Sequence, residues 1–495
     1  MGRDIEEARF TREDRRRYRE KLRRELDVLR RMLEAGAFEG ERARVGIEVE
    51  FHVVDADGEP MMINEQLLSR LESEDFQTEL AQFNIEFNLS PHRLVGSVFG
   101  EIEEELATSF DHAQRRAQEL DANVVMIGIL PTLEDLHVTT RNLSANPRYH
   151  LLNEQILAAR GEDLSLRIEG VESLDAQAGS ITVEAAATSV QIHLQASPDR
   201  FARVWNAATA ISAAQVAVGA NSPFFLGKQL WQETRIAVFE QTIDTRTEEL
   251  AAQGVRPRVW FGEGWVQEVT ELFEENVRYF PALLPLLDEE DPDAQLAAGE
   301  IPHLPELVLH NGTIWRWNRP IYDVARGKPH LRVENRVLPA GPSVTDITAN
   351  AAFYLGLVRA VTELDPPIDE RFPFERAADS FRCAARDGLD AALFWPGLGS
   401  VPAPELILET LLPMAHDGLD AWKVDPRDRD RCLGVIERRC AAQITGAAWQ
   451  VETFHHLLDR GRGDRRAALT EMTRRYMEGM RANEPVHAWP RPRSP

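Results

Sequence analysis

The chain has 495 residues, a formal net charge of −25, and 43% hydrophobic and 28% charged residues. So acidic a chain repels polyanions, which excludes nucleic acid and anionic membrane surfaces as expected partners. It has no apolar run long enough for a transmembrane helix and no apolar leader, and its three cysteines are an odd number, so a cytoplasmic protein without a disulfide framework is expected.

The first predicted element is a helix over residues 12–36, in which leucines recur at helical spacing. We interpret residues 1–44 as an N-terminal helical segment that docks through this apolar stripe. The next element, over residues 45–54, alternates apolar and polar side chains and is rich in β-branched residues, which predicts a strand. Turn-forming residues at 55–60 end it.

Strands and helices then alternate along the chain. Further strands are predicted over 81–90, 123–131, 189–196, 311–320 and 329–339, and helices over 97–121 and 201–220. The acidic segment 284–307 contains prolines and is predicted to be a surface excursion. Because the strands lie mostly far apart in sequence, an α+β fold around one antiparallel sheet is expected, with helices packed on one face.

The C-terminal third is predicted to be mostly helical over residues 346–480. Its Arg-rich end, from Asp459 onward, is predicted to fray, with residues 481–495 as a flexible tail. This division leaves residues 45–345 as the main domain. The sequence predicts neither the oligomeric state nor the role of the C-terminal third.

Long polar side chains occupy one face of each predicted strand, since residues two apart share a face. A single face of this kind is usually solvated, but these faces contain few of the Lys, Thr and Ser residues that normally fill a wet sheet surface. The polar faces comprise Glu48, Glu50 and His52; Gln82, Asn84, Glu86 and Asn88; Gln191, His193 and Gln195; Arg316 and Asn318; and Arg332, Glu334 and Arg336.

Glu48 and Glu50 place two carboxylates side by side, which is repulsive unless a cation or a proton relieves it. With Glu86 and Glu334 on the same face, the set would suit several Mg²⁺ ions and a nucleotide. Arginines on that face would grip phosphate or carboxylate groups bidentately. The sequence has no P-loop and no Rossmann fingerprint, so bound ATP would depend on carboxylate-held Mg²⁺.

These residues resemble the glutamate–cysteine ligase family, in particular the branch of bacterial carboxylate–amine ligases and plant-type enzymes. The matching segments follow the family's order over roughly residues 44–345. They are GIEVEF (46–51), ELAQFNIEFNLSP (79–91), NPRYHLLNE (146–154), SVQIHLQ (189–195), NSPFFLGKQLWQETRI (221–236), and NGTIWRWNRPIYD through LRVENRVLPAGPS (311–343).

The resemblance implies a glutamine-synthetase-like antiparallel catalytic sheet over residues 45–345. It implies that ATP phosphorylates the γ-carboxylate of glutamate and that the amine of cysteine then displaces phosphate, a step of glutathione biosynthesis. Phosphorylation gives the carboxylate a leaving group, and Mg²⁺ neutralises the phosphate charge. The implied partners are small molecules: glutamate, cysteine or another amine, and ATP.

Site residues carry over by motif. The resemblance implies metal ligands at Glu48, Glu50, Glu79, Glu86 and Glu334, catalytic roles for Arg336 and Arg235, and substrate binding by Arg235, Arg316 and Asn88. Many bacterial members have G-x-H-x-H on the third strand, where this chain has Ser189 and Gln191 and keeps only His193. Gln191 matches the plant-type pattern, and either Gln191 or His193 is a candidate metal ligand; a hydrogen-bonded His193 is the alternative.

Two rival hypotheses stay open. The first is a ligase of the same chemistry with another acceptor amine, because no motif names cysteine. The second is a catalytically degenerate binding protein of the same fold, and Mg²⁺-dependent nucleotide binding would discriminate against it. A hydrolase that uses a Glu pair and water has no supporting motif beyond the carboxylates.

Overall fold

The computed structural model describes residues 10–40, 43–461 and 463–491. At its centre lies a seven-stranded sheet in the order β12-β13-β7-β1-β3-β2, with β4 paired to β1. Every pair in this sheet is antiparallel, which confirms the predicted α+β class. The strands are β1 (Arg44–Val54), β2 (Phe76–Thr78), β3 (Asn84–Arg93), β4 (Asn123–Val125), β7 (Ser189–Ala196), β12 (Asn318–Ala325) and β13 (Lys328–Pro339).

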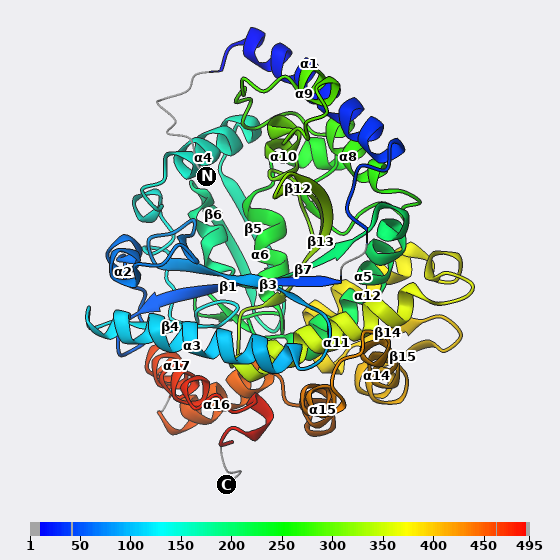
Figure 1. The fold of residues 1–495 in the computed structure, drawn as a ribbon. Helices are drawn as coiled ribbons and strands as arrows, with labels where there is room; N and C mark the ends of the chain where they lie inside the picture. The colour runs from blue at the N-terminus through cyan, green and yellow to red at the C-terminus, as the bar shows by residue number, and fades with distance from the viewer. Residues whose placement is uncertain (1–9, 41–42, 462, 492–495) are drawn as a thin grey trace.

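One face of the sheet is covered by α3 (Val98–Gln118) and α5 (Pro198–Gly219), with α11 (Val344–Thr362) packed against both helices (Figure 1). Phe51 of β1 stacks on Phe110 of α3 with ring centroids 6.2 Å apart. Trp205 of α5 donates its indole N–H to the Asn318 carbonyl at 2.8 Å. Full burial of one such aromatic side chain contributes roughly 2–3 kcal/mol, so this apolar layer fixes which face of each strand turns inward.

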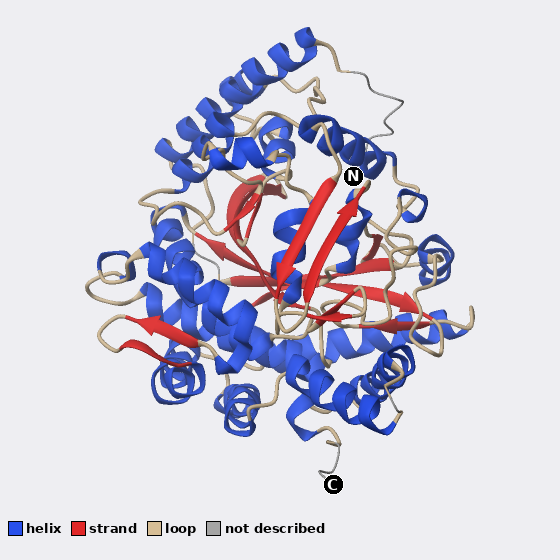
Figure 2. Ribbon diagram, turned by 180° about the vertical axis from the view of Figure 1, so that it is seen from behind, coloured by secondary structure: helices blue, strands red, loops and turns tan. Residues whose placement is uncertain are grey.

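The opposite face of the sheet carries the long polar side chains. On that side stand α6 (Thr234–Thr242) and the hairpin of β5 (Leu164–Glu169) and β6 (Ser173–Ala178), as Figures 1 and 2 show from opposite directions. Strand alternation thus separates an apolar, helix-packed face from a polar face that these elements border.

The predicted N-terminal helix is α1 (Arg12–Glu34), which begins with a capping box between Thr11 and Asp14. It docks on α10 (Pro305–Asn311) through buried polar side chains. Lys21 Nζ lies 3.0 Å from Glu306 Oε1, and Glu25 Oε2 accepts a hydrogen bond from the Leu307 N–H at 2.6 Å. The predicted helix is confirmed, and Leu22, Leu26 and Leu29 of its apolar stripe are buried; the assignment of residues 1–44 as one segment stays a prediction.

Glu25 should make the docking of α1 sensitive to pH. Burial, followed by contact with Glu306, raises the pKa of Glu25 to about 10. A carboxyl whose folded pKa is raised stabilises the fold fully below its unfolded pKa, and this contribution is lost as pH rises towards the folded pKa. The stability of the wild type should therefore fall relative to Glu25→Gln as pH rises from about 5 to about 9.

Denaturant unfolding of both proteins at several pH values would measure this difference. A stability gap that does not change with pH would show that Glu25 is ionised in the folded state.

The segment 284–307 is only partly a surface excursion. It contains α9 (Pro292–Ala297), but Leu284, Leu304 and Glu306 are buried beneath α1 and its neighbours. The predicted strand over 123–131 is also shorter than expected, because pairing with β1 ends at Val125; beyond it, one isolated antiparallel bridge joins Ile129 to Ala187.

The C-terminal third is helical, as predicted, through α12 (Phe374–Asp387), α14 (Leu412–Ala421), α15 (Pro426–Ala442), α16 (Gly446–Arg460) and α17 (Arg465–Arg481). The predicted fraying from Asp459 is wrong for the described residues. Asp464 caps α17, which buries Met472 and Tyr476, and Trp489 beyond it is buried too. Residues 492–495 lie outside the described residues. The domain boundary at residue 345 stays a prediction.

Within the described ranges, no helix is both long enough and apolar enough to cross a membrane. The remaining elements are shorter and peripheral to the sheet. They are α2 (Asn64–Leu71), α4 (Pro147–Arg160), α7 (Glu248–Ala252), α8 (Val269–Tyr279), α13 (Ala403–Leu406), β8 (Phe224–Phe225), β9 (Lys228–Gln229), β10 (Val259–Trp260), β11 (Trp315–Arg316), β14 (Ala392–Trp395) and β15 (Gly399–Pro402).

Candidate functional site

The register of the sheet brings the predicted acidic residues together on its polar face. Glu50 of β1 lies opposite Glu86 of β3. Glu48 lies opposite Gln191 of β7. Glu334 of β13 lies opposite His193. Four strands that are distant in sequence therefore contribute to one polar surface.

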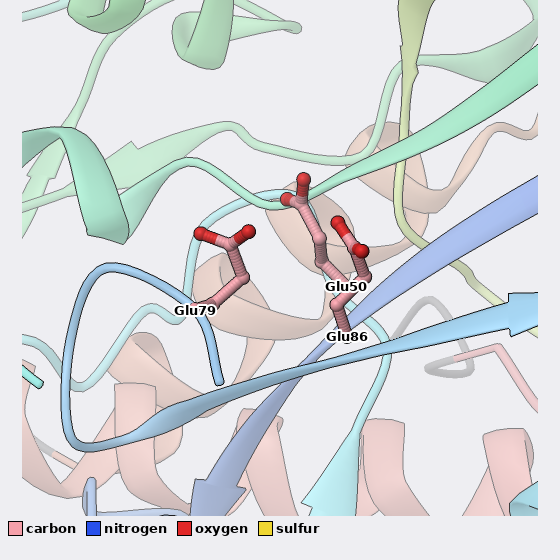
Figure 3. Close-up of side chains that lie close together, drawn as sticks. All are labelled: Glu50, Glu79 and Glu86. Carbon is pink, nitrogen blue, oxygen red and sulfur yellow. The ribbon is translucent and has the colours of Figure 1, made fainter. Parts of the chain in front are cut away.

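An acidic cluster of Glu50, Glu79 and Glu86 forms at one end of this surface. Each contributes a carboxylate oxygen, and these oxygens lie within 4.8 Å of one another (Figure 3). Glu79 comes from the turn that leads into β3, and its Oε2 accepts a hydrogen bond from the Leu80 N–H at 2.8 Å. Three carboxylates at this separation need a cation or shared protons to relieve their repulsion.

The electrostatics of the acidic cluster reflect that repulsion. Burial and the charge of Glu50 raise the pKa of Glu79 to about 7. Burial, with the charges of Glu48 and Glu79, holds the pKa of Glu86 well above its usual range. Without a cation the cluster retains protons near neutral pH, and a divalent cation would displace them.

A second, charge-paired group lies beside the acidic cluster. Glu334 Oε1 lies 2.5 Å from Arg336 Nη1, and Glu334 Oε2 lies 2.8 Å from Arg319 Nη2. Burial alone would raise the pKa of Glu334, but the two arginines hold it far below its usual range. Glu48 Oε1 lies 3.0 Å from His193 Nε2, without hydrogen-bond geometry.

Gln191 connects the two groups. Its amide nitrogen donates to Glu50 Oε1 at 3.0 Å, and its amide oxygen accepts from Arg336 Nη1 at 2.5 Å. Ser189 also donates to Glu50 through its backbone N–H and its hydroxyl. Both ends of the Gln191 amide are engaged within the protein, which favours a bridging role. Metal binding by Gln191 or His193 stays a prediction.

Arg316 does not lie with Arg336, so the prediction that the two share a face is wrong. Its strand, β11, pairs in parallel with β10 instead of joining the main sheet. Its guanidinium bonds to Glu275 and Asn276 of α8 and lies 5.3 Å from the Trp260 ring. Its predicted role as a substrate ligand lacks this geometric support.

Arg319 is a residue of the polar face that the sequence prediction missed. The prediction of one continuous strand over 311–320 places Asn318 on the polar face. The structure breaks this strand at Trp317, so the polar face of β12 begins with Arg319 instead. The Asn318 amide instead donates to Ser212 of α5 at 3.1 Å, and Arg319 turns towards Glu334. In the structure Asn318, Pro320 and Tyr322 are the buried residues of this strand, and no sequence signal indicates this face.

Arg235 is almost fully buried at the start of α6, with 3% of its surface exposed. Its guanidinium contacts Glu233 and the backbone carbonyls of Arg336 and Val337. The predicted contact with a substrate carboxylate is not supported by these partners.

Asn88 lies beside the acidic cluster and donates to Glu86 Oε1 at 2.9 Å, and its substrate role stays a prediction.

Glu184, in the 3-10 helix η2 (Ile181–Ala186), is a further residue that the sequence did not indicate. The Asn84 amide donates to the Ala185 carbonyl at 3.1 Å, which places η2 against the polar face. Burial, then the charges of Glu79 and Glu50, holds the pKa of Glu184 well above its usual range. A short 3-10 turn has no periodicity that would mark such a residue.

A cavity of about 620 Å³ opens beside Glu48 and His193, where the N-terminal half of β1 meets the β12–β13 hairpin. Its lining is mixed: basic side chains come from Arg44, Arg326, Lys328, His330 and Arg332, and carboxylates come from Glu39, Glu48 and Asp323. Lys328 lies 3.7 Å from Glu39, and Arg332 lies 3.1 Å from Asp323. The small excess of positive charge suits an anionic ligand that reaches towards Glu48.

The sequence matches the family described as glutamate-cysteine ligase family 2 (GCS2) over residues 44–424. The chain belongs to this family. The GCS2 match confirms the resemblance seen in the sequence motifs, and it extends past residue 345 to just beyond α14, further than the segments that carried the resemblance. A comparison with curated proteins found no match.

Among solved structures, this GCS2 member is similar to glutamate–cysteine ligase from Francisella tularensis in complex with AMP, with 13% identity and a TM-score of 0.52 over 90% of this chain and 91% of that chain. At this identity the likeness shows the fold alone.

Two further structures have TM-scores too low to argue from. A bifunctional glutathione synthetase from Pasteurella multocida has 11% identity and a TM-score of 0.44, covering 93% of this chain and 55% of that one. The ligase PafA, in complex with the prokaryotic ubiquitin-like protein Pup, has 10% identity and a TM-score of 0.36, covering 85% and 69%.

Proposed function

We propose that this GCS2 member is a cytoplasmic ligase that uses ATP and Mg²⁺ to join the γ-carboxylate of glutamate to the amine of cysteine. The observation that carries the proposal is the acidic cluster beside Arg336 on one face of an antiparallel sheet. These carboxylates converge without balancing cations and lie next to a fixed guanidinium. Such an arrangement suits transfer of a phosphoryl group whose charge is neutralised by bound Mg²⁺ and by the guanidinium.

The proposed reaction has two steps. An oxygen of the glutamate γ-carboxylate attacks the terminal phosphorus of ATP, so that a C–O–P linkage forms and ADP leaves. The amine nitrogen then attacks the acyl carbon, the C–O bond to phosphate breaks, and phosphate leaves as the C–N bond forms. The amine gives up a proton in this second step. The products are the γ-glutamyl amide, ADP and phosphate.

The residues present fit magnesium. Glu50, Glu79 and Glu86 offer hard oxygen ligands in a buried setting, and their raised pKa values show the strain that a cation would relieve. Bound Mg²⁺ would neutralise phosphate oxygens and align them for transfer. Glu48 and Glu334 are already paired with cationic or imidazole groups, so they are the weaker candidates for direct ligation.

Other residues of the chain orient the substrates in this proposal. Arg336 is fixed by Gln191 and Glu334 and presents its charge to the transferred phosphoryl group. The cavity beside Glu48 would accommodate the nucleotide phosphates. The hairpin of β5 and β6, together with α6, borders the polar face (Figure 2).

The choice of cysteine as the acceptor rests on family membership alone. A carboxylate–amine ligase with a different acceptor is the alternative. A pocket for a small apolar side chain discriminates by only about 1–3 kcal/mol per methylene, so slow use of analogues such as 2-aminobutyrate is expected beside cysteine.

The test supplies glutamate, ATP and Mg²⁺ with each amino acid in turn, follows phosphate release and identifies the product by mass. We expect γ-glutamylcysteine, with ADP and phosphate formed in equal amounts. A different γ-glutamyl amide would replace the cysteine assignment, and stoichiometric AMP would move the chain to another class of ligase. The absence of any product, together with the absence of Mg²⁺-dependent nucleotide binding, would favour the degenerate binding protein.

A further inference from the structure

We propose that Arg235 is a positioning residue: it does not bind substrate but fixes the β-bulge of β13 that aims Arg336 at the reacting groups. The proposal rests on the ligase function proposed above for the role of Arg336. It departs from the substrate-binding role that the motif implied for Arg235. Three sets of contacts support it.

The first is an irregularity in β13. The pairing of β13 with β7 shifts register between Asn335 and Leu338, so that Arg336 and Val337 lie in a bulge. On the side of β13 that faces β12, the Arg336 N–H continues that pairing and bonds the Trp317 carbonyl at 2.9 Å. Bulges re-aim a side chain at the cost of regular ladder bonds, so the carbonyls within them need other donors.

The second set shows that Arg235 is that donor. Its Nη2 donates to the Val337 carbonyl, and its Nη1 lies 3.4 Å from the Arg336 carbonyl. Its Nε donates to Glu233 Oε1 at 2.9 Å. All three guanidinium nitrogens are thus engaged within the protein, and the outer face of the group lies 5.6 Å from the Trp317 ring.

The third set anchors Arg235 itself through the C-terminal helices. Glu233 Oε2 accepts from the Asn221 N–H at 2.8 Å. The Asn221 amide donates to the Tyr476 hydroxyl of α17 at 2.7 Å and accepts from the Gln450 amide of α16 at 2.9 Å. The Tyr476 hydroxyl in turn donates to the Met126 carbonyl at 2.8 Å. Through these contacts, α16 and α17 help to fix the position of Arg235.

The result at the polar face is a fixed Arg336. Its Nη1 reaches both Gln191 and Glu334 at 2.5 Å, and these partners tolerate little movement of the backbone that carries it. Misplacing a catalytic group by about 1 Å costs on the order of 100-fold in rate. A lysine at position 235 would keep the charge beside Glu233 but would lose the fork that holds two carbonyls.

The kinetic test compares Arg235→Lys, Arg336→Lys and the double variant. We expect Arg235→Lys to lower kcat by about 100-fold while KM for each substrate stays within about two-fold. The double variant should be no slower than Arg336→Lys alone, because Arg235 acts through Arg336. A large rise in KM for an amino acid substrate with kcat kept, or additive losses in the double variant, would overturn the proposal.

A matched pair of tyrosine variants tests the anchoring contacts without touching the site. Tyr476→Phe removes the hydroxyl that Asn221 contacts, and we expect kcat to fall by about three- to ten-fold at unchanged KM. Tyr354→Phe is the control, because that tyrosine is fully buried and its hydroxyl has no partner among the described residues. Equal activity in both variants would remove the C-terminal helices from the proposal.

A crystal structure of Arg235→Lys separates failure of this inference from failure of the proposed function, since it needs no turnover. Displacement of residues 336–337 with loss of the Arg336–Gln191 hydrogen bond supports the positioning role even in a chain that ligates nothing. An unmoved Arg336 side chain would overturn it, whatever the activity of the wild type.

Discussion

Replacing Glu86 by glutamine should abolish turnover and at the same time stabilise the metal-free protein. Glu86 of β3 lies directly opposite Glu50 on the neighbouring strand β1, and both belong to the acidic cluster. Removing its charge takes away a magnesium ligand, which should lower kcat by about a thousand-fold. It also removes a buried carboxyl group whose ionisation the fold disfavours, because burial and the charges of Glu48 and Glu79 hold its pKa well above its usual range; the gain in stability is on the order of 1 kcal/mol.

Thermal unfolding with and without Mg²⁺, beside the ligase assay, would measure both effects. Mg²⁺ should raise the unfolding temperature of the wild type but not of Glu86→Gln, since a ligand stabilises only a fold that binds it. Glu104→Gln, at an exposed position of α3, is the control and should match the wild type in both assays. A variant that keeps its Mg²⁺ response and its turnover would place the metal elsewhere.

Replacing Arg336 by lysine should lower kcat by about 100-fold, although the positive charge is kept. The guanidinium bonds Gln191 and Glu334 from one nitrogen, and Coulomb attraction to Glu334 overcomes burial to hold the pKa of Arg336 above its usual range. A lysine ammonium has no planar fork and would not reproduce this geometry alongside a phosphoryl group.

Steady-state kinetics on Arg336→Lys and on Arg382→Lys would check this result. Arg382 is an exposed arginine whose nearest carboxylate, on Glu240, lies 3.9 Å away, so its replacement should leave kcat unchanged. Near-normal turnover in Arg336→Lys would reduce the residue to a structural partner of Glu334.

Strand alternation predicted the polar face where strands were long and regular. Glu48 and Glu50 of β1, Glu86 of β3 and Glu334 of β13 occupy the common face that period-two spacing implied. The apolar face of each such strand packs on α3 or α5, which fixes the orientation of the strand. Once one residue is known to face the helices, alternation gives the direction of every other side chain in the strand.

Prediction failed where regular strands end. Trp317 separates β11 from β12, and the pairing of β11 with β10 sends Arg316 towards α8, while Arg319 takes the position beside Glu334. Neither spacing nor composition marks such a break.

Arg235 shows a second limit of the sequence. Its motif indicates that Arg235 lies near the functional site. Whether the guanidinium contacts substrate or backbone carbonyls depends on packing between segments far apart in the sequence, which the motif does not show. Glu184 shows a third, because it reaches the site from a 3-10 turn that has no hydrophobic period. The buried end of the chain was mistaken for a tail because its many arginines lie around a narrow apolar stripe.

The order in which the chain is synthesised gives the sheet topology a further consequence. All three carboxylates of the acidic cluster lie within the first 86 residues of the chain, on β1, β3 and the turn between β2 and β3. Gln191 follows Glu50 by 141 residues, Arg336 follows Gln191 by 145, and Tyr476 follows Asn221 by 255. Such long-range pairings form late in folding. A nascent chain on the ribosome therefore contains all three carboxylates well before Gln191 and Arg336 have been made, and protons or free cations must neutralise the carboxylates if β1 and β3 pair before then.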